Sequence, residues 1–360
     1  MKKILLRIYK YYLIYLVSIF ARNRRPCNYE RQVLIARFDG FGDFCLLIPF
    51  IQNLSANGYN IVCISSSAFE PVIKHLQLQV TFLPFNNQTT YEFRKLLKTV
   101  NSMNFDYAFN LSMNVWGGIL VNQSRAGKKI GLLQEREHYV YKGARLFYDQ
   151  ILSYPPSIHS FDVLQNTFKD TMKTPPAKHF IVSETGNDKY IVLHPYAKWK
   201  PRQWPNFHSL IEILNQRGFN IKIIGTPQEH KGNPWISEVT KYNCVSIINL
   251  QSIDGLLSQI ENTSAFIGND SGPAHYAALI GKPTTVIWGP GYFERIHPVG
   301  ENVQICILPS TCRPCRQKNS VCKKGANFCL IEISVEMVLE AFERTLLKAA
   351  DEVKLVPTFQ

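Results

Sequence analysis

The 360-residue sequence predicts a two-domain α/β protein, in which two parallel sheets covered by helices face each other across a cleft. Short apolar runs alternate with amphipathic helical stretches along most of the chain, as expected for buried parallel strands and the helices that connect them. Between residues 174 and 188, Pro, Gly and polar residues are typical of an interdomain linker. The length also suffices for two such domains.

These features predict four parts. Residues 1–30 form a basic, apolar N-terminal helix, residues 31–182 the first α/β domain and residues 183–332 the second. Residues 333–360 form a C-terminal helix and tail, because Val335, Val338, Leu339 and Phe342 repeat with a helical period.

The N-terminal segment is strongly basic. Residues 1–25 carry seven Lys or Arg and no acid, and residues 11–21 are largely apolar. That run is short for a transmembrane helix, which needs about 20 residues, and a second basic cluster stands where a signal peptide has its cleavage site. We expect an interfacial helix on anionic lipid; the alternative is a first helix packed on the protein itself.

Positive charge is concentrated in the first half of the chain. The formal net charge is +13, with 22 Lys and Arg against 11 Asp and Glu in residues 1–180, and 18 against 16 in residues 181–360. The first half is therefore expected to face an anionic partner, either a membrane surface or a phosphorylated glycolipid. No basic stretch interleaved with aromatic residues points to nucleic acid.

The first domain begins with a buried strand at 32–37, a turn containing Gly40, Gly42 and Asp43, and a helix at 46–56. A dinucleotide-binding turn needs a third glycine where Cys45 stands, so NAD binding is disfavoured. Asp43 is either a partner of the helix dipole or a carboxylate base at the carboxyl end of a strand, where ligands of α/β proteins bind.

The rest of this domain continues the alternation. Helices are predicted at 69–76, 90–103 and 161–172, strands at 60–64, 80–83, 105–111 and 129–133, and a turn at 116–118. Between residues 134 and 156 the periodicity fades and basic residues, including Arg136 and Arg145, gather. This region is either a loop that faces the substrate or an ordinary solvated basic face.

The second domain has strands predicted at 190–193, 220–224 and 245–250 and helices at 207–216 and 253–260. The loop 194–205 carries Lys198, Lys200 and Arg202, which are either solvated or suited to a diphosphate. No P-loop lysine motif and no acidic pair for a metal-bound nucleotide is present.

A tight polar turn connects a strand ending at Ile267 with a short helix that ends near Gly281. The turn contains Asp270, Ser271 and Gly272, followed by His275. Free N–H groups and the positive end of the helix dipole suit a phosphate there. The alternative is a capped helix with no ligand.

Four cysteines cluster near the end of the second domain, at Cys312, Cys315, Cys322 and Cys329. Without a convincing signal peptide the compartment is expected to be reducing, so disulfides are not the default. The two interpretations are a structural zinc site with four thiolate ligands and free or paired thiols.

Three stretches together resemble glycosyltransferase family 9, the bacterial lipopolysaccharide heptosyltransferases with the GT-B fold of two Rossmann-like domains. They are residues 37–43, residues 194–205, and residues 268–275 together with Gly281-Lys282-Pro283. The resemblance extends over roughly residues 32–345.

The resemblance implies an inverting, metal-independent transfer of a sugar, heptose from ADP-heptose, to a lipopolysaccharide core or related surface glycan. Asp43 would be the general base; Gly42, Arg136 and Arg145 would meet the anionic glycolipid acceptor. The implied donor-binding residues are Lys198, Arg202, Glu229, Asp270, Ser271, Gly272 and His275.

The resemblance further implies a bacterial protein without a catalytic cofactor, in the cytoplasm and peripheral on the inner membrane. Two other functions fit the same pattern: a nucleotide-sugar epimerase or hydrolase, and a non-catalytic membrane-associated sugar-binding protein.

Overall fold

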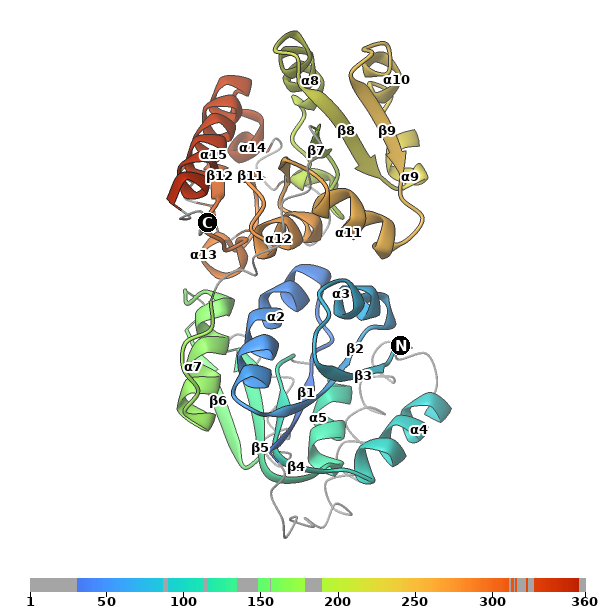
Figure 1. Cartoon of the computed structure of the whole chain (residues 1–360), viewed down its shortest axis with the longest axis vertical. Coiled ribbons are helices and arrows are strands. Elements are labelled where there is room, and N and C mark those ends of the chain that lie inside the picture. The colour runs from blue at the N-terminus through green and yellow to red at the C-terminus, as the bar shows by residue number, and fades with distance from the viewer. Residues whose placement is uncertain are drawn as a thin grey trace, which may run out of the picture. The chain divides into compact units, whose positions relative to one another are not determined.

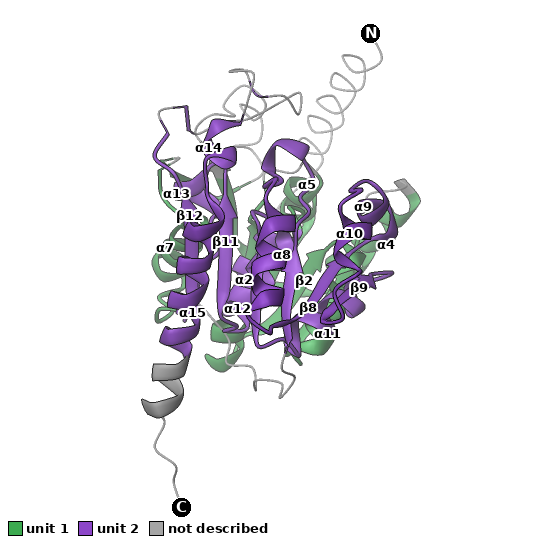
Figure 2. Cartoon of the chain, turned by 90° about the horizontal axis from the view of Figure 1, so that it is seen from above, with its two compact units in different colours: residues 1–40, 50–177 green, residues 41–49, 178–360 purple. Residues whose placement is uncertain are grey.

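The structure is a computed structural model that describes residues 31–86, 90–112, 115–134, 148–155, 157–178, 190–310, 312–313, 315, 322 and 327–355 (Figure 1). The helix expected at residues 1–30 lies outside these ranges. The chain divides into two compact units, residues 1–40 with 50–177 and residues 41–49 with 178–360 (Figure 2). The division after Ala177 comes five residues before the boundary predicted at 182.

Each unit contains one six-stranded, fully parallel sheet. The order is β3-β2-β1-β4-β5-β6 in unit 1 and β12-β11-β10-β7-β8-β9 in unit 2. Numbered from the first strand of each unit, both orders are 3-2-1-4-5-6, which is the Rossmann order. The two sheets are therefore topological copies of each other.

The strands of unit 1 are β1 (Gln32–Ala36), β2 (Asn60–Ser65), β3 (Val80–Pro84), β4 (Asn104–Asn110), β5 (Arg125–Gln134) and β6 (Gln150–Tyr154). Its helices are α2 (Phe41–Ala56), α3 (Glu70–His75), α4 (Thr90–Asn101), α5 (Val115–Gln123) and α7 (Ser160–Met172), with the 3-10 helix η1 (Ser67–Phe69). Residues 41–49 of α2 belong to unit 2, and Pro49 lies inside the helix at this division.

The strands of unit 2 are β7 (Tyr190–His194), β8 (Asn220–Gly225), β9 (Val245–Asn249), β10 (Ala265–Asn269), β11 (Thr284–Trp288) and β12 (Val303–Ile307). Its helices are η4 (Lys200–Arg202), α8 (Phe207–Gln216), α9 (Pro227–Lys231), α10 (Ile236–Val239), α11 (Ile253–Glu261), α12 (Gly272–Leu279), α13 (Phe293–Ile296), α14 (Phe328–Ile331) and α15 (Val335–Leu355).

The central strands are buried on both faces, as expected in a parallel sheet covered by helices. In β4, Ala108 belongs to the cluster formed with α4 and α5, whereas its neighbour Phe109 packs on Phe168 of α7 with ring centroids 5.1 Å apart. Every residue of β7, β10 and β11 is buried. These strands form a rigid platform for the loops at their ends.

The C-terminal helix is part of the core of unit 2. Val338, Leu339 and Phe342 of α15 are buried in the same apolar cluster as α8, and Phe342 contacts Phe219 edge-on at 5.6 Å between ring centroids. The helix expected within residues 333–360 is therefore an integral element of this unit.

Three local expectations differ from the structure. Residues 116–118 lie inside α5 and form no turn, because Gly117 lets the helix approach β4: a Cβ there would stand 2.4 Å from Oδ1 of Asn110. Strand β6 lies in the region where the periodicity fades. Helix α2 begins at Phe41 and not at residue 46, which places Asp43 in its first turn.

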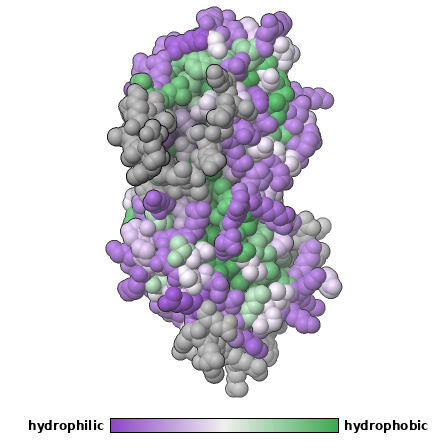
Figure 3. Space-filling view, in the orientation of Figure 1, coloured by the Kyte–Doolittle hydropathy of each residue, from purple (hydrophilic) through white to green (hydrophobic). Residues whose placement is uncertain are grey.

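The side chains on the visible surface are mostly hydrophilic, in contrast to the apolar cores (Figure 3). Hydrophilic side chains cover much of the visible face in Figure 3, with smaller apolar areas between them. In the described part of the chain, no helix combines the length and the apolar character that crossing a membrane requires.

A substitution at Gly225 tests how tightly the carboxyl end of β8 is packed. An added Cβ would stand 2.3 Å from the Tyr196 ring, so Gly225→Ala should lower the free energy of unfolding by about 1–3 kcal/mol. Gly255→Ala in α11, where a Cβ meets only ordinary contacts at 3.8 Å, should instead be neutral or stabilising by up to about 1 kcal/mol. Urea denaturation of both variants measures the contrast, and equal effects would contradict the packing described.

Candidate functional site

The candidate site of unit 2 lies where β7 and β10 lie side by side. The chain enters the sheet at β7 and builds outward in one direction through β8 and β9, then returns to β10 and builds in the other. Loops at the carboxyl ends of such a strand pair diverge, and ligands of α/β proteins bind in the resulting crevice. Here these loops are residues 195–206 and the turn Asp270–Ser271.

Asn269 fixes these two loops to each other. Its side chain is fully buried; Nδ2 donates to the carbonyl of Pro195 at 2.8 Å, and Oδ1 accepts from the backbone N–H of Trp204 at 3.0 Å. Trp204 is anchored in turn by its indole N–H, which donates to the carbonyl of Ile333 at 2.9 Å. The loop that carries Arg202 is therefore held at both of its ends.

Arg202 and Asp270 form a largely buried ion pair. Nη1 donates to Oδ2 at 2.6 Å, and the side chains are 16% and 5% exposed. The guanidinium also stacks on Trp199, with 4.6 Å between Cζ and the ring centroid. Gly291, with a φ of 142°, provides space on another side, because a Cβ there would lie 3.3 Å from Nη2.

This environment alters the acidity of Asp270. Burial raises its pKa from 3.8 to about 6; the Arg202 guanidinium opposes the shift, and the Asp43 carboxylate adds to it. Arg202 uses one of its five N–H donors on this contact, so the cation is positioned with donor capacity remaining.

Ser271 is the N-cap residue of α12, but its side chain does not cap the helix. Its hydroxyl instead lies 3.2 Å from Nδ1 of His194, at the end of β7. Burial lowers the pKa of His194 to about 4, so this ring is neutral at pH 7. Pro273 has no N–H, and the N–H of Ala274 donates to the carbonyl of Ser271 at 3.2 Å. The N–H of Gly272 lacks a side-chain cap from Ser271 and can serve an anion.

The first turn of α2 packs against the first turn of α12, within unit 2. Glycine is required on both sides: a Cβ on Gly42 would stand 2.7 Å from Cδ2 of His275, and one on Gly272 would stand 2.8 Å from Cδ1 of Phe41. This close approach brings Asp43 within electrostatic range of Asp270 and His275, whose pKa values it raises.

His275 is held neutral beside Asp43. The side chain is buried, which lowers its pKa to about 4 although Asp43 opposes the shift. Its Nδ1 atom has no hydrogen-bond partner among the residues that the structure describes. At pH 7 this ring can donate or accept one hydrogen bond but carries no charge.

The remaining predicted donor-site residues have different surroundings. Lys198 is exposed. Glu229 forms the capping box of α9, where its carboxylate accepts from the Thr226 N–H at 2.8 Å and the hydroxyl at 2.9 Å. Its charge raises the pKa of His194, so the carboxylate lies near this end of the sheet. Arg136 and Arg145 lie outside the described residues.

The four clustered cysteines remain unassigned. Cys312 is exposed, while Cys315, Cys322 and Cys329 are half-buried. Burial raises the pKa of Cys329, and the other three thiols add to this shift. Within the described ranges no three His, Cys, Asp or Glu side chains are arranged to hold a metal ion, and the zinc site stays a prediction.

Two residues that support the site were not predicted from the sequence. Asn269 precedes Asp270 directly, but only the structure shows that its amide joins two loops. Trp199 stands between predicted cations, and its aromatic character beside Lys198 and Arg202 was the available signal.

The family is established by a comparison with protein-family models. The model of glycosyltransferase family 9 (heptosyltransferase) matches residues 93–326, more than half of the chain. The chain belongs to glycosyltransferase family 9.

Curated relatives of this family 9 chain are heptosyltransferases. It is 26% identical to lipooligosaccharide heptosyltransferase 2 of Campylobacter jejuni over 227 residues, 58% of this chain and 70% of that protein. It is 25% identical to the Haemophilus influenzae enzyme of the same name over 162 residues, 43% of this chain. That match spans about half, 46%, of the relative's length.

Solved structures show the same fold. E. coli heptosyltransferase WaaC with ADP aligns with a TM-score of 0.70 at 17% identity, over 87% of this chain and 99% of that one. A family 9 glycosyltransferase from Veillonella parvula aligns with a TM-score of 0.73, also at 17% identity, over 90% and 100% of the two chains. The predicted GT-B class, with two Rossmann-like units, is confirmed.

His275 makes stability depend on pH. A neutral buried ring with a pKa of about 4 cannot take up the proton that the unfolded chain binds below about 6.5, so stability falls as the pH drops from 6.5 to 4. His275→Gln should remove up to roughly 3 kcal/mol of this loss.

The measurement is urea unfolding of wild type and variant across this pH range. Asp270 contributes with the opposite sign, because its raised pKa lowers stability as the pH increases from about 4 to 6. That contribution is common to both proteins and cancels in the difference. His275→Asn removes the same ring and should reproduce the change, and a wild-type pH profile in both variants would contradict the role of His275.

Proposed function

We propose that this family 9 chain is an inverting glycosyltransferase of the heptosyltransferase type. One observation carries the proposal: the Asp43 carboxylate is within electrostatic range of Asp270 and His275, and Asp270 pairs with Arg202. Arg202 and the amino end of α12 are the anion site that we propose. Inverting transfer needs a base for the acceptor and a stabiliser for the leaving group. Both kinds of group are gathered here.

The proposed reaction is a single displacement at the anomeric carbon. An acceptor hydroxyl oxygen forms a bond to that carbon while the bond from the carbon to the β-phosphate oxygen breaks. Asp43 takes the hydroxyl proton, and the nucleoside diphosphate leaves with the bonding electron pair. The carboxylate is suited to this role because it lies half-buried in the first turn of a helix that approaches the anion site.

The diphosphate would be held by charge and by backbone dipoles. Arg202 supplies a guanidinium fork with donors beyond the one used on Asp270, and such a fork binds phosphate oxygens in pairs. The N–H of Gly272 would add the amino end of α12, since Pro273 has no N–H and the N–H of Ala274 donates to the carbonyl of Ser271. His275 would contribute a neutral hydrogen bond and no charge.

The proposed donor is ADP-heptose, and the proposed acceptor a lipopolysaccharide core or a related surface glycan. The names of the curated relatives and of the WaaC structure with ADP support this choice. Lys198 and Glu229 would extend the donor site, and Gly42, Arg136 and Arg145 would meet the acceptor. We further propose that transfer needs no metal and takes place peripherally on the cytoplasmic face of the inner membrane.

Asp43→Asn tests the proposed base. Transfer should fall by about 10²- to 10⁴-fold because the proton acceptor is lost, while ADP binding persists. The assay incubates purified protein with a panel of sugar nucleotides and membrane glycolipid, with EDTA present, and weighs the products by mass spectrometry. Asp162→Asn, which alters an aspartate in the first turn of α7, is the matched control. Near-normal transfer by Asp43→Asn would reject the base, and sugar release without an acceptor would indicate a hydrolase.

Trp199 should affect donor binding through Arg202. Trp199→Ala removes the ring that stacks on the guanidinium and should raise KM for the sugar nucleotide by about 3- to 10-fold, with a smaller effect on kcat. Trp199→Phe retains an aromatic face and should recover most of the affinity. Steady-state kinetics with the donor varied decides this, and equal losses in both variants would contradict the stacking role.

A further inference from the structure

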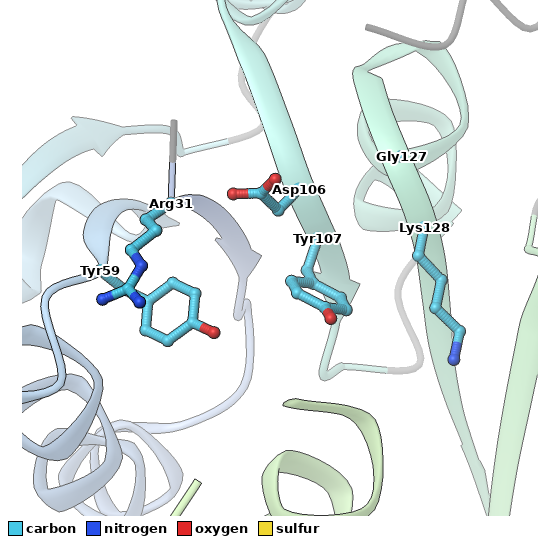
Figure 4. A pocket seen from close by; sticks show the side chains of 6 residues that line it. All are labelled: Arg31, Tyr59, Asp106, Tyr107, Gly127 and Lys128. Atoms are coloured by element: carbon cyan, nitrogen blue, oxygen red, sulfur yellow. The ribbon is translucent and has the colours of Figure 1, made fainter. Parts of the chain in front are cut away.

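Unit 1 contains a pocket that the sugar-transfer site does not use. Its volume is about 410 Å³, and it is lined by Arg31, Tyr59, Asp106, Tyr107, Gly127 and Lys128 (Figure 4). The pocket lies near the amino ends of β1, β2, β4 and β5, because its lining residues directly precede β1 and β2 or lie within the first four residues of β4 and β5. The crevice typical of α/β ligands lies at the opposite, carboxyl edge of a sheet.

Two cations line this pocket. The side chain of Lys128 makes no hydrogen bond or ion pair with the described residues. The Arg31 side chain makes one weak hydrogen bond with them, from Nη1 to the carbonyl of Asn57 at 3.5 Å. Asp106 is the one carboxylate, and it already accepts from the backbone N–H of Gln32 at 3.0 Å. The net charge of the lining is therefore positive.

Lys128 and Lys129 are successive residues of β5, but their side chains have different surroundings. Lys129 is buried and donates to the carbonyl of Asn122, while successive residues of a strand point to opposite faces. Lys128 pairs with Tyr107 in the register of β4 and β5, so their side chains leave the same face of the sheet. Figure 4 shows Arg31 and Tyr59 at one end of the row of lining residues and Lys128 at the other.

The backbone at Arg31 contributes to this arrangement. Arg31 has a φ of 51°, a left-handed conformation that residues other than glycine seldom adopt. Gly58 is also left-handed, and a Cβ there would stand 3.2 Å from Nη1 of Arg31. The turn before β2 thus leaves room for the guanidinium beside Tyr59.

We propose that this pocket binds the phosphodiester headgroup of an anionic phospholipid. The cations match the phosphate, the Tyr59 hydroxyl can bond to one of its oxygens, and the volume fits a small headgroup. A membrane source is favoured because the basic, apolar residues 1–25 lie just upstream of Arg31, the first pocket residue. Stable binding at a membrane surface commonly needs two such weak signals together.

The test measures sedimentation of the full chain with phosphatidylcholine vesicles that contain or lack phosphatidylglycerol. The double variant Arg31→Gln/Lys128→Gln should lower binding to the anionic vesicles by about 10- to 30-fold. The matched control Arg94→Gln/Lys98→Gln removes the same charge from the exposed face of α4 and should lower it by at most about 3-fold. Circular dichroism verifies that both variants are folded.

Three results would overturn the proposal. The first is an equal loss of vesicle binding in the two double variants, and the second is vesicle binding that does not depend on phosphatidylglycerol. The third is binding of inorganic or glycerol phosphate, measured by calorimetry, that anionic vesicles do not displace. The site depends on the proposed membrane location and not on the transfer chemistry. Sugar transfer to a soluble acceptor is therefore measured in parallel and should be unchanged by Arg31→Gln/Lys128→Gln. Loss of vesicle binding with intact transfer would support the lipid pocket independently of the transfer reaction. Loss of transfer with intact vesicle binding would contradict the lipid pocket.

Discussion

The buried ion pair between Arg202 and Asp270 is the interaction on which the candidate site depends. A guanidinium that is 16% exposed needs a counter-charge, and Asp270 provides one at 2.6 Å. The pair also holds the loop after β7 against the turn after β10, beside the Asn269 amide that joins the same two segments. A diphosphate that reaches this cation therefore meets a positioned donor and not a flexible surface side chain.

Burial determines the charge of the histidines around this ion pair. His194 and His275 both have pKa values lowered to about 4, so neither adds a positive charge at pH 7. Burial and repulsion from Asp43 disfavour the charged form of Asp270 and raise its pKa, although Arg202 lies beside it. An anionic ligand at Arg202 would add to this repulsion, which offers a physical route by which ligand binding and the protonation of Asp270 are linked.

The two sheets share one topology but use different edges for the proposed roles. In unit 2 the proposed anion site lies at the carboxyl ends of the neighbouring strands β7 and β10. In unit 1 a basic pocket lies at the amino ends of the strands, next to the point where the N-terminal segment joins the fold. The uneven charge of the two halves agrees with this assignment, since most of the excess positive charge lies in the first 180 residues.

The sequence by itself determined the α/β class and most strands, because apolar runs in buried parallel strands are a local pattern. It also determined the polar turn at Asp270–Ser271 before a short helix, and the position of Asp43 near a helix start. It did not predict β6, whose residues are only partly buried, nor the helical conformation of Trp116–Gly118, which depends on the contact of Gly117 with Asn110. Only the tertiary structure decided that Arg202 pairs with Asp270, that Ser271 bonds to His194 and that Gly42 packs on His275. Each of these contacts joins segments far apart in the chain, and local sequence patterns carry no information on such pairings.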